Sequence, residues 1–199
     1  MSSKKKVAYL GPGKDSFGFQ ALIQHFRDWK VNPIASVSHT EICCKVGKMQ
    51  VDFGVVAVEN VIDGVVSETI RSVEYADAQF GVKICGEEVV SIDMRLLAQK
   101  EVKVSELKRI ASHRVAINQC AKIVSKLQTK GVEGIVSDST SEAVAMARSD
   151  KCVGALASLN ALKLFEDLQD LGGQNMIDYA NSQTRFLGAF QATRSFCFR

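Results

Sequence analysis

Short apolar segments of strand type alternate with helix-type segments along almost the whole of this chain of 199 residues. Residues 7–10, 51–60 and 152–158 read as strands, because short apolar runs there are bounded by turn residues. Between such runs, apolar side chains recur at helical spacing, as in Phe19, Leu22, Ile23, Phe26 and Trp29. This alternation predicts the α/β class with mainly parallel sheets.

The expected helices share apolar positions on one face and polar start or stop residues. They cover residues 17–29, 38–47, 65–75, 104–108, 116–131, 140–150 and 160–168. Residues 81–98 are expected to be extended, and the strand–helix pattern repeats on either side of them. We therefore expect two lobes, the first from residues 1–85 and about 174–199 and the second from residues 86–173. Small ligands are expected in a cleft at the strand ends.

Charge and composition exclude several classes of protein. The 25 basic and 22 acidic side chains give a net charge of +3, too balanced to indicate nucleic acid binding. No apolar run reaches the ~18 residues of a membrane helix, and no signal-peptide pattern opens the chain. The six cysteines form no C-x-x-C pair, and no His/Cys spacing suits a metal. These features predict a reducing, cytoplasmic location.

Three polar junctions at strand ends are candidates for chemistry, and each also has a purely structural explanation. GPGKDSFGF can hold an anion on its backbone N–H groups, or only begin a helix. Glu59 and Asn60 can orient a substrate or cap the next helix. The stretch 138–142 (DSTSE) suits a helix N-cap with Glu142 in the first turn. No Ser/His/Asp order or Cys/His pairing is evident, so residue patterns alone stop at a two-lobed α/β protein.

Six stretches, in chain order, resemble the prephenate dehydratase family. VAYLGPGKDSFGFQA is similar to its opening strand, Gly-Pro turn and helix, and DFGVVAVENVIDGVVSETI to its Glu-Asn-Ser segment. SHRVAINQC, SDSTSEAVAMA and GALASLNALKLF resemble its Ser-His-Pro-Gln, Ser-Thr-Ala-Glu-Ala and Ala-Ala-Ile-Ala-Ser stretches. NSQTRFLGAF resembles its Thr-Arg-Phe signature. The matches run from about Val7 to Phe190, and their order makes them specific.

The resemblance implies a two-lobed fold of the periplasmic-binding-protein type (type II) with the site in the cleft between the lobes. It implies a lyase of phenylalanine biosynthesis that converts prephenate to phenylpyruvate, losing carbon dioxide and water without a cofactor. Prephenate is the implied small-molecule partner, and a homo-oligomer is implied as well. The regulatory amino-acid-binding (ACT) domain of the family is not expected in this chain.

The same resemblance implies roles for eight residues. Thr184 would donate a hydrogen bond to the departing hydroxyl, because hydroxide is a poor leaving group. Arg185 would bind a carboxylate or hold the cleft, and Phe186 would shape the pocket for the ring. Five polar residues at strand ends would line the cleft and bind substrate: Glu59, Asn60, Ser16, Ser139 and Thr140.

Several positions depart from the family pattern and keep two alternatives open. The opening motif contains one inserted residue, which gives Ser16-Phe17-Gly18. Val61 replaces the serine of Glu-Asn-Ser, and Met94 stands where a histidine is usual. His-Pro-Gln has become His113-Arg114-Val115. A prephenate decarboxylase that leaves the ring non-aromatic is the first alternative, and a non-catalytic module that binds small anions is the second.

Overall fold

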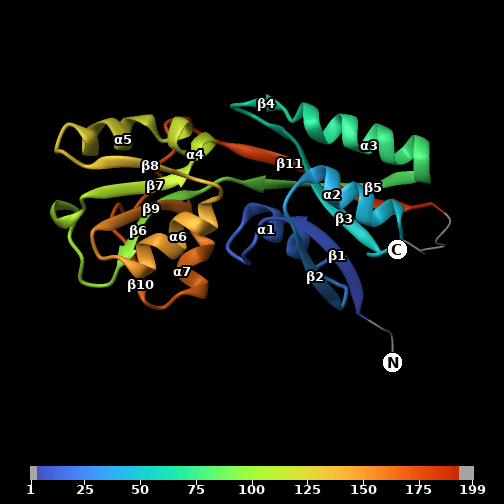
Figure 1. The fold of residues 1–199 in the computed structure, drawn as a ribbon, viewed down its shortest axis with the longest axis horizontal. Helices are drawn as coiled ribbons and strands as arrows, with labels where there is room; N and C mark the ends of the chain where they lie inside the picture. Colours follow the sequence, from blue (N-terminus) through green and yellow to red (C-terminus); the bar gives the residue numbers. More distant parts are fainter. Residues whose placement is uncertain (1–3, 193–199) are drawn as a thin grey trace. The chain divides into compact units, whose positions relative to one another are not determined.

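The computed structural model describes residues 4–192, and these form two compact units (Figure 1). The first unit contains the chain up to Gly13, then Phe17–Ser91, and the chain from Gln183 onward. The second contains Lys14–Ser16 and Ile92–Ser182. The long passages between the units thus occur after Ser91 and after Ser182, where the sequence analysis expected them near residues 85 and 174.

The first unit is built on one sheet with helices on both faces. Its strands lie in the order β2 (Val31–Ser36), β1 (Lys5–Leu10), β3 (Phe53–Asn60), β11 (Gln183–Gln191) and β5 (Val82–Ser91), and the short β4 (Gly64–Val65) pairs with β3. Its helices are α1 (Phe17–His25), α2 (His39–Gly47) and α3 (Ser67–Phe80).

The two faces of this sheet have separate apolar cores. Ile42 and Val46 of α2 pack with Ala76 of α3 and with Val56 and Ala189 of the sheet. On the opposite face, the rings of Phe26 and Trp29 contact Phe53, with centroid distances of 5.1 and 5.3 Å. Burying each such large apolar side chain stabilises the fold by roughly 1.5–3 kcal/mol. Both faces of β3 and β11 are therefore covered, which holds these two strands in place.

The second unit has its own sheet, in the order β10 (Leu168–Asp170), β6 (Met94–Gln99), β9 (Val153–Ser158), β7 (Arg109–His113) and β8 (Glu133–Ser137). Its helices are η1 (Val104–Glu106), α4 (Arg114–Gln119), α5 (Ala121–Gln128), α6 (Thr140–Ser149) and α7 (Asn160–Leu164). Its core joins Ala143, Val144 and Ala147 of α6 to Ala111 and Ala155 of the sheet.

The prediction of mainly parallel sheets was wrong, because both sheets are mixed. Among the described strands, β1 pairs in parallel with β2 and β3, and β7 with β8 and β9. The other pairings are antiparallel, including those of β11 with β3 and β5. The chain leaves the first unit along β5 and returns along β11, so no crossover helix connects these neighbours and they run in opposite directions.

Some helix boundaries also differ from the prediction. The helix expected over residues 17–29 ends at His25, and the following turn places Trp29 against Phe53. The helix expected over residues 116–131 is divided into α4 and α5 at Cys120. Asp178 accounts for the division, because its carboxylate accepts from Lys122 N–H at 3.0 Å and its own N–H donates to the Gln119 carbonyl at 2.8 Å.

Three further predicted segments are shorter or shifted. The helix expected over residues 65–75 begins later, at Ser67, and extends to Phe80, because Gly64 and Val65 pair with β3 instead. The helix expected over residues 160–168 ends at Leu164 and is followed by β10. Of the helix expected over residues 104–108, only the 3-10 turn η1 (Val104–Glu106) is present.

Candidate functional site

The strand β11 carries the predicted Thr184–Arg185–Phe186 motif, and its two faces have different surroundings. Successive side chains of a strand point to opposite faces of the sheet. A Cβ atom added at Gly188 would lie 2.8 Å from His25 of α1, so the face of Thr184, Phe186 and Gly188 is the α1 face. Leu187 and Ala189 pack with α2 and α3, which places Arg185 on the other face. Thr184 and Arg185 are therefore directed apart.

Thr184 is paired with Asn60 across the β3–β11 ladder. Its side-chain oxygen accepts a hydrogen bond from the Asn60 amide nitrogen at 2.8 Å, and only 9% of the residue is exposed. The Asn60 amide oxygen accepts from the N–H groups of Ile62 and Asp63 at 2.9 and 3.2 Å. The amide therefore both holds the turn between β3 and β4 and contacts the Thr184 hydroxyl.

Arg185 is engaged on the opposite face of the sheet. Its guanidinium donates to the Glu59 carboxylate at 2.8 Å and lies 3.6 Å from that of Glu87 on β5. The three residues come from β3, β11 and β5, which are adjacent strands. About half of each of the Arg185 and Glu59 side chains is exposed, so the pair is solvated. Two of the residues predicted to bind substrate, Arg185 and Glu59, are thus paired with each other.

Phe186 lies two residues beyond Thr184 and is buried, with 4% of its surface exposed. It pairs with Ala57 of β3, because β3 has an extra residue between the partners of Arg185 and Phe186. Such a bulge changes the local twist and the direction of the strand next to it. In this strand it lies directly beside the pairing of Arg185 with Glu59.

The second unit brings together the other predicted residues, Ser16, Ser139 and Thr140. The hydroxyl of Ser139 accepts from Glu142 N–H at 3.0 Å and caps α6, as predicted, and Thr140 begins the helix. Ser16 is buried in the segment Lys14–Ser16, which belongs to this unit. Its neighbour Asp15 accepts a hydrogen bond from the Ser141 hydroxyl at 2.9 Å.

The pair of Asp15 and Ser141 was not predicted as part of a site. Asp15 is 3% exposed, which is unusual for a carboxylate, and its hydrogen bond reaches the first turn of α6. The two residues are 126 positions apart, so no sequence spacing relates them. Only their place in the sequence could have indicated them, because Asp15 precedes Ser16 and Ser141 follows Thr140.

Burial suppresses the ionisation of three cysteine thiols among the described residues. Burial raises the pKa of Cys43 and Cys120 to about 12 and that of Cys85 to about 11, so these thiols stay protonated at neutral pH. Within residues 4–192, no group of three His, Cys, Asp or Glu side chains is placed to hold a metal ion. No helix in that range is long and apolar enough to cross a membrane. Cys197 lies outside the described residues.

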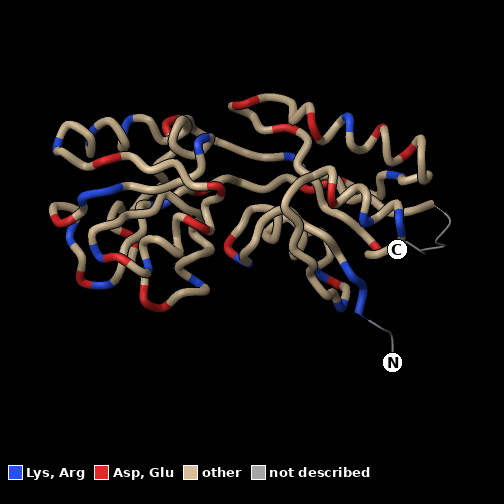
Figure 2. Tube along the Cα trace, viewed as in Figure 1, with Lys and Arg blue, Asp and Glu red and all other residues tan. Residues whose placement is uncertain are grey.

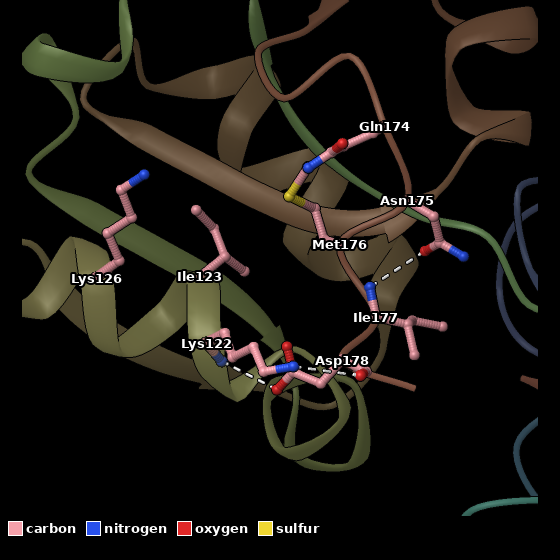
Figure 3. Close-up of a pocket in the computed structure, with 8 residues that line it drawn as sticks. All are labelled: Lys122, Ile123, Lys126, Gln174, Asn175, Met176, Ile177 and Asp178. Atoms are coloured by element: carbon pink, nitrogen blue, oxygen red, sulfur yellow. Dashed lines mark hydrogen bonds between the residues drawn. The ribbon is translucent and has the colours of Figure 1, made fainter. Parts of the chain in front are cut away.

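A pocket in the second unit is lined by none of the predicted residues (Figure 3). It has a volume of about 270 Å³ and is lined by residues of α5 and of the segment 174–178. Lys122 and Lys126 are its charged donors, and Asp178 is its carboxylate. Its Asn175 amide is used within the fold, since it accepts from Met94 N–H at 3.0 Å and donates to the Ile92 carbonyl at 3.2 Å.

Charged residues are distributed along both units, with Lys and Arg interspersed among Asp and Glu (Figure 2). Many of them form ion pairs within one unit, such as Arg95 with Asp93 and Asp170. The hydrogen bonds that the Arg95 guanidinium donates to both carboxylates raise its pKa, and the bonds to Asp93 have the larger effect.

Comparison with known proteins assigns a family to this arrangement. Residues 7–191 match the family model described as prephenate dehydratase. A bifunctional chorismate mutase/prephenate dehydratase of Aquifex aeolicus is 32% identical over 188 residues, which are 94% of this chain and 49% of that protein. The chain belongs to the prephenate dehydratase family. It spans about half the length of the curated relatives that it matches first.

Solved structures show the same fold. A prephenate dehydratase from Arthrobacter aurescens, crystallised in complex with L-Phe, superposes with a TM-score of 0.81 at 22% identity, covering 98% of this chain and 62% of that one. The substrate-binding domain of a putative molybdenum ABC transporter from Clostridium difficile has a TM-score of 0.51 at 8% identity, over 94% and 85% of the two chains. The predicted fold class, α/β of the periplasmic-binding-protein type, is confirmed.

Proposed function

We propose that this chain is a prephenate dehydratase, which converts prephenate to phenylpyruvate with loss of carbon dioxide and water. Membership of the family supports this reaction. The observation that carries the proposal is the buried Thr184 hydroxyl, which accepts a hydrogen bond from Asn60 and so keeps its own hydrogen for a substrate.

The chemistry requires a hydrogen-bond donor more than a base. Departure of carbon dioxide leaves its bonding electron pair in the ring, and that pair expels the ring hydroxyl as the ring becomes aromatic. The departing oxygen gains negative charge, so a donor at that position stabilises the transition state more than the ground state. A threonine hydroxyl is too weak an acid for full proton transfer, and Thr184 therefore acts through a hydrogen bond that strengthens as charge develops.

One helix end in the second unit is of a kind that binds carboxylates. The N-terminus of α6 presents backbone N–H groups, and the hydroxyl of Thr140 stands at its first position. The hydroxyl of Ser139 is already used as the cap, so its proposed role is to hold this end of the helix. Ser16 and Thr140 are proposed to bind substrate on the basis of the family resemblance.

Arg185 and Glu59 are proposed to support the motif from the opposite face. Their ion pair joins β11 to β3 at the register that also pairs Thr184 with Asn60. Phe186 is proposed to close the apolar side of the ring pocket next to Thr184. No cofactor is part of this proposal, and the implied partner is the small-molecule substrate alone.

The proposal also covers the cellular location and the oligomeric state of the protein. The described cysteines are free thiols, which agrees with a reducing, cytoplasmic compartment. A homo-oligomer is proposed from the family resemblance. Light scattering on the purified protein measures its mass in solution, and a monomer at micromolar concentration would contradict this part.

Product identification tests the function. Purified protein is incubated with prephenate, and the products are identified by mass and by the absorbance of phenylpyruvate. Phenylpyruvate supports dehydration, whereas a dihydro product that keeps its hydroxyl would show a non-aromatising decarboxylase. That alternative has a specific observation in its favour, since the exposed Val61 replaces a hydroxyl next to Asn60. Bound but unchanged prephenate would show a binding module.

A further inference from the structure

The orientation of the Asn60 amide is determined by its neighbours. Its oxygen lies 2.9 Å from Ile62 N and 3.2 Å from Asp63 N, both of which are donors. If the amide were rotated by half a turn, its NH₂ group would face these two donors and both hydrogen bonds would be lost. The NH₂ group therefore faces Thr184, at 2.8 Å.

This orientation decides which way the Thr184 hydroxyl bonds. An amide NH₂ group only donates, so the Thr184 oxygen must accept. Among residues 4–192 this is the one hydrogen bond of the Thr184 side chain, and its hydroxyl hydrogen is therefore available to another acceptor. The surroundings are largely closed to water, because Thr184 is 9% exposed and Val90, its partner on β5, is 1% exposed.

The backbone around Asn60 holds the amide in this position. Asn60 pairs with Thr184 on one side and with Gly64 of β4 on the other, and Val61 N–H donates to the Gln183 carbonyl at 3.0 Å. Asn60 thus lies between two paired strands, β11 and β4, and two fixed N–H groups donate to its side-chain oxygen. Little freedom remains for it to follow a substrate, which distinguishes it from a flexible binding group.

We propose that Asn60 is a positioning residue that fixes Thr184 as a hydrogen-bond donor, rather than a residue that binds substrate. This inference rests on the proposed dehydration by Thr184. Without the hydrogen bond from Asn60, the rotation of the Thr184 hydroxyl is no longer fixed and its hydrogen is no longer directed to the leaving oxygen.

Asn60→Asp provides the sharpest variant. The carboxylate has the same size and still accepts from Ile62 and Asp63, so the turn is kept. Its second oxygen can only accept, and the Thr184 hydroxyl must then donate to it. We expect kcat to fall to within about tenfold of Thr184→Ala, which itself should lose roughly 100- to 1000-fold. Asn32→Asp, on the exposed side of β2, adds the same charge elsewhere in the unit and serves as the control.

A double-mutant cycle separates positioning from substrate binding. If Asn60 acts through Thr184, the kcat lost in Asn60→Asp is not lost again when the substitution is added to Thr184→Ala. The pH profile provides a second test. On acidification the introduced carboxyl group becomes protonated and can donate again, so kcat of Asn60→Asp should recover, in contrast to that of the wild type.

Each outcome is decisive. If Asn60→Asp and Thr184→Ala lower kcat independently of each other while the wild type turns over prephenate, the inference is overturned and the proposed function stands. No turnover of prephenate by the wild type would overturn both. Should Asn60→Asp fail to fold, as shown by circular dichroism, Asn60→Ala replaces it in the same cycle. The same absence of a second loss in the Thr184→Ala background is expected.

Discussion

At the scale of single residues, the alternation of a strand separates the parts of a motif that are adjacent in sequence. Thr184 points to the α1 face with Asn60, and Arg185 points to the α2 and α3 face with Glu59. The motif can therefore combine two tasks in two neighbouring residues. In the proposed function, Thr184 takes part in the chemistry and Arg185 supports the strand that carries it.

Thr184→Ala is expected to reduce kcat by roughly 100- to 1000-fold, because one donor to the developing charge is removed. KM should change little, since the interaction forms mainly in the transition state. Thr184→Ser keeps the hydroxyl and should retain most of the turnover. Steady-state kinetics with prephenate measure both variants, and undiminished kcat in Thr184→Ala would remove the residue from the mechanism.

The ion pair of Arg185 and Glu59 is expected to be weak. Both side chains are about half exposed, so water screens their attraction and a coupling free energy of about 0.2–1 kcal/mol is expected. Urea unfolding of Arg185→Ala, Glu59→Gln and the double variant measures it. KM for prephenate in Arg185→Ala should stay near the wild-type value. A large rise in KM would instead show that the guanidinium leaves Glu59 to bind a substrate carboxylate.

At the scale of elements, the hairpin of β3 and β4 supports Asn60. Gly64 pairs with Asn60 and has a φ of +78°, a left-handed conformation that costs other residues about 1–2 kcal/mol. A Cβ atom at Gly64 would meet nothing within 4 Å, so the strain is purely conformational.

Gly64→Ala should therefore lower both stability and turnover. Gly131→Ala is a matched control, because Gly131 has a φ of +85° and equally open surroundings after α5. Both variants should lose about 1–2 kcal/mol of unfolding free energy. Only Gly64→Ala should lower kcat. Equal turnover in the two variants would show that the hairpin does not position Asn60.

Most elements of this fold were predictable from local sequence patterns. The core strands, the α6 cap at Ser139 and the strand that carries Thr184 follow from apolar runs and capping residues. The division of a helix at Cys120 was not predictable, because Asp178 causes it from a distant loop. The antiparallel course of β11 was missed for the same reason, since it depends on the return of the chain through the second unit.

The candidate site divides in a similar way. Family resemblance selected Thr184 and Asn60, and the structure places them in one hydrogen bond. The resemblance could not show that Thr184 and Arg185 point to opposite faces of the sheet, because this follows from the strand register and the packing of the helices. Nor could it show that Glu59 is paired with Arg185 or that Asp15 contacts Ser141.

At the scale of the whole molecule, stability should depend on pH through a buried histidine. Burial lowers the pKa of His39 from its ordinary value of 6.5, although the carboxylate of Glu68 opposes this effect. His39 Nδ1 is buried without a hydrogen-bond partner among the described residues. Between the lowered pKa and 6.5, the unfolded chain binds a proton that the folded chain does not.

The stability that neutral His39 contributes is thus fully present above pH 6.5 and is lost as the pH falls toward the lowered pKa. Urea unfolding across this range should show a decline in the free energy of unfolding. His39→Gln has no titrating ring and should show a smaller decline. The same decline in both proteins would assign the acid sensitivity to other groups.

We propose that this chain couples decarboxylation of prephenate to loss of the ring hydroxyl. The most direct measurement is the ratio of phenylpyruvate formed to carbon dioxide released, followed in one reaction with purified protein. We expect one molecule of phenylpyruvate for each molecule of carbon dioxide. Release of carbon dioxide without phenylpyruvate would contradict the account, because the hydroxyl would then remain on the ring.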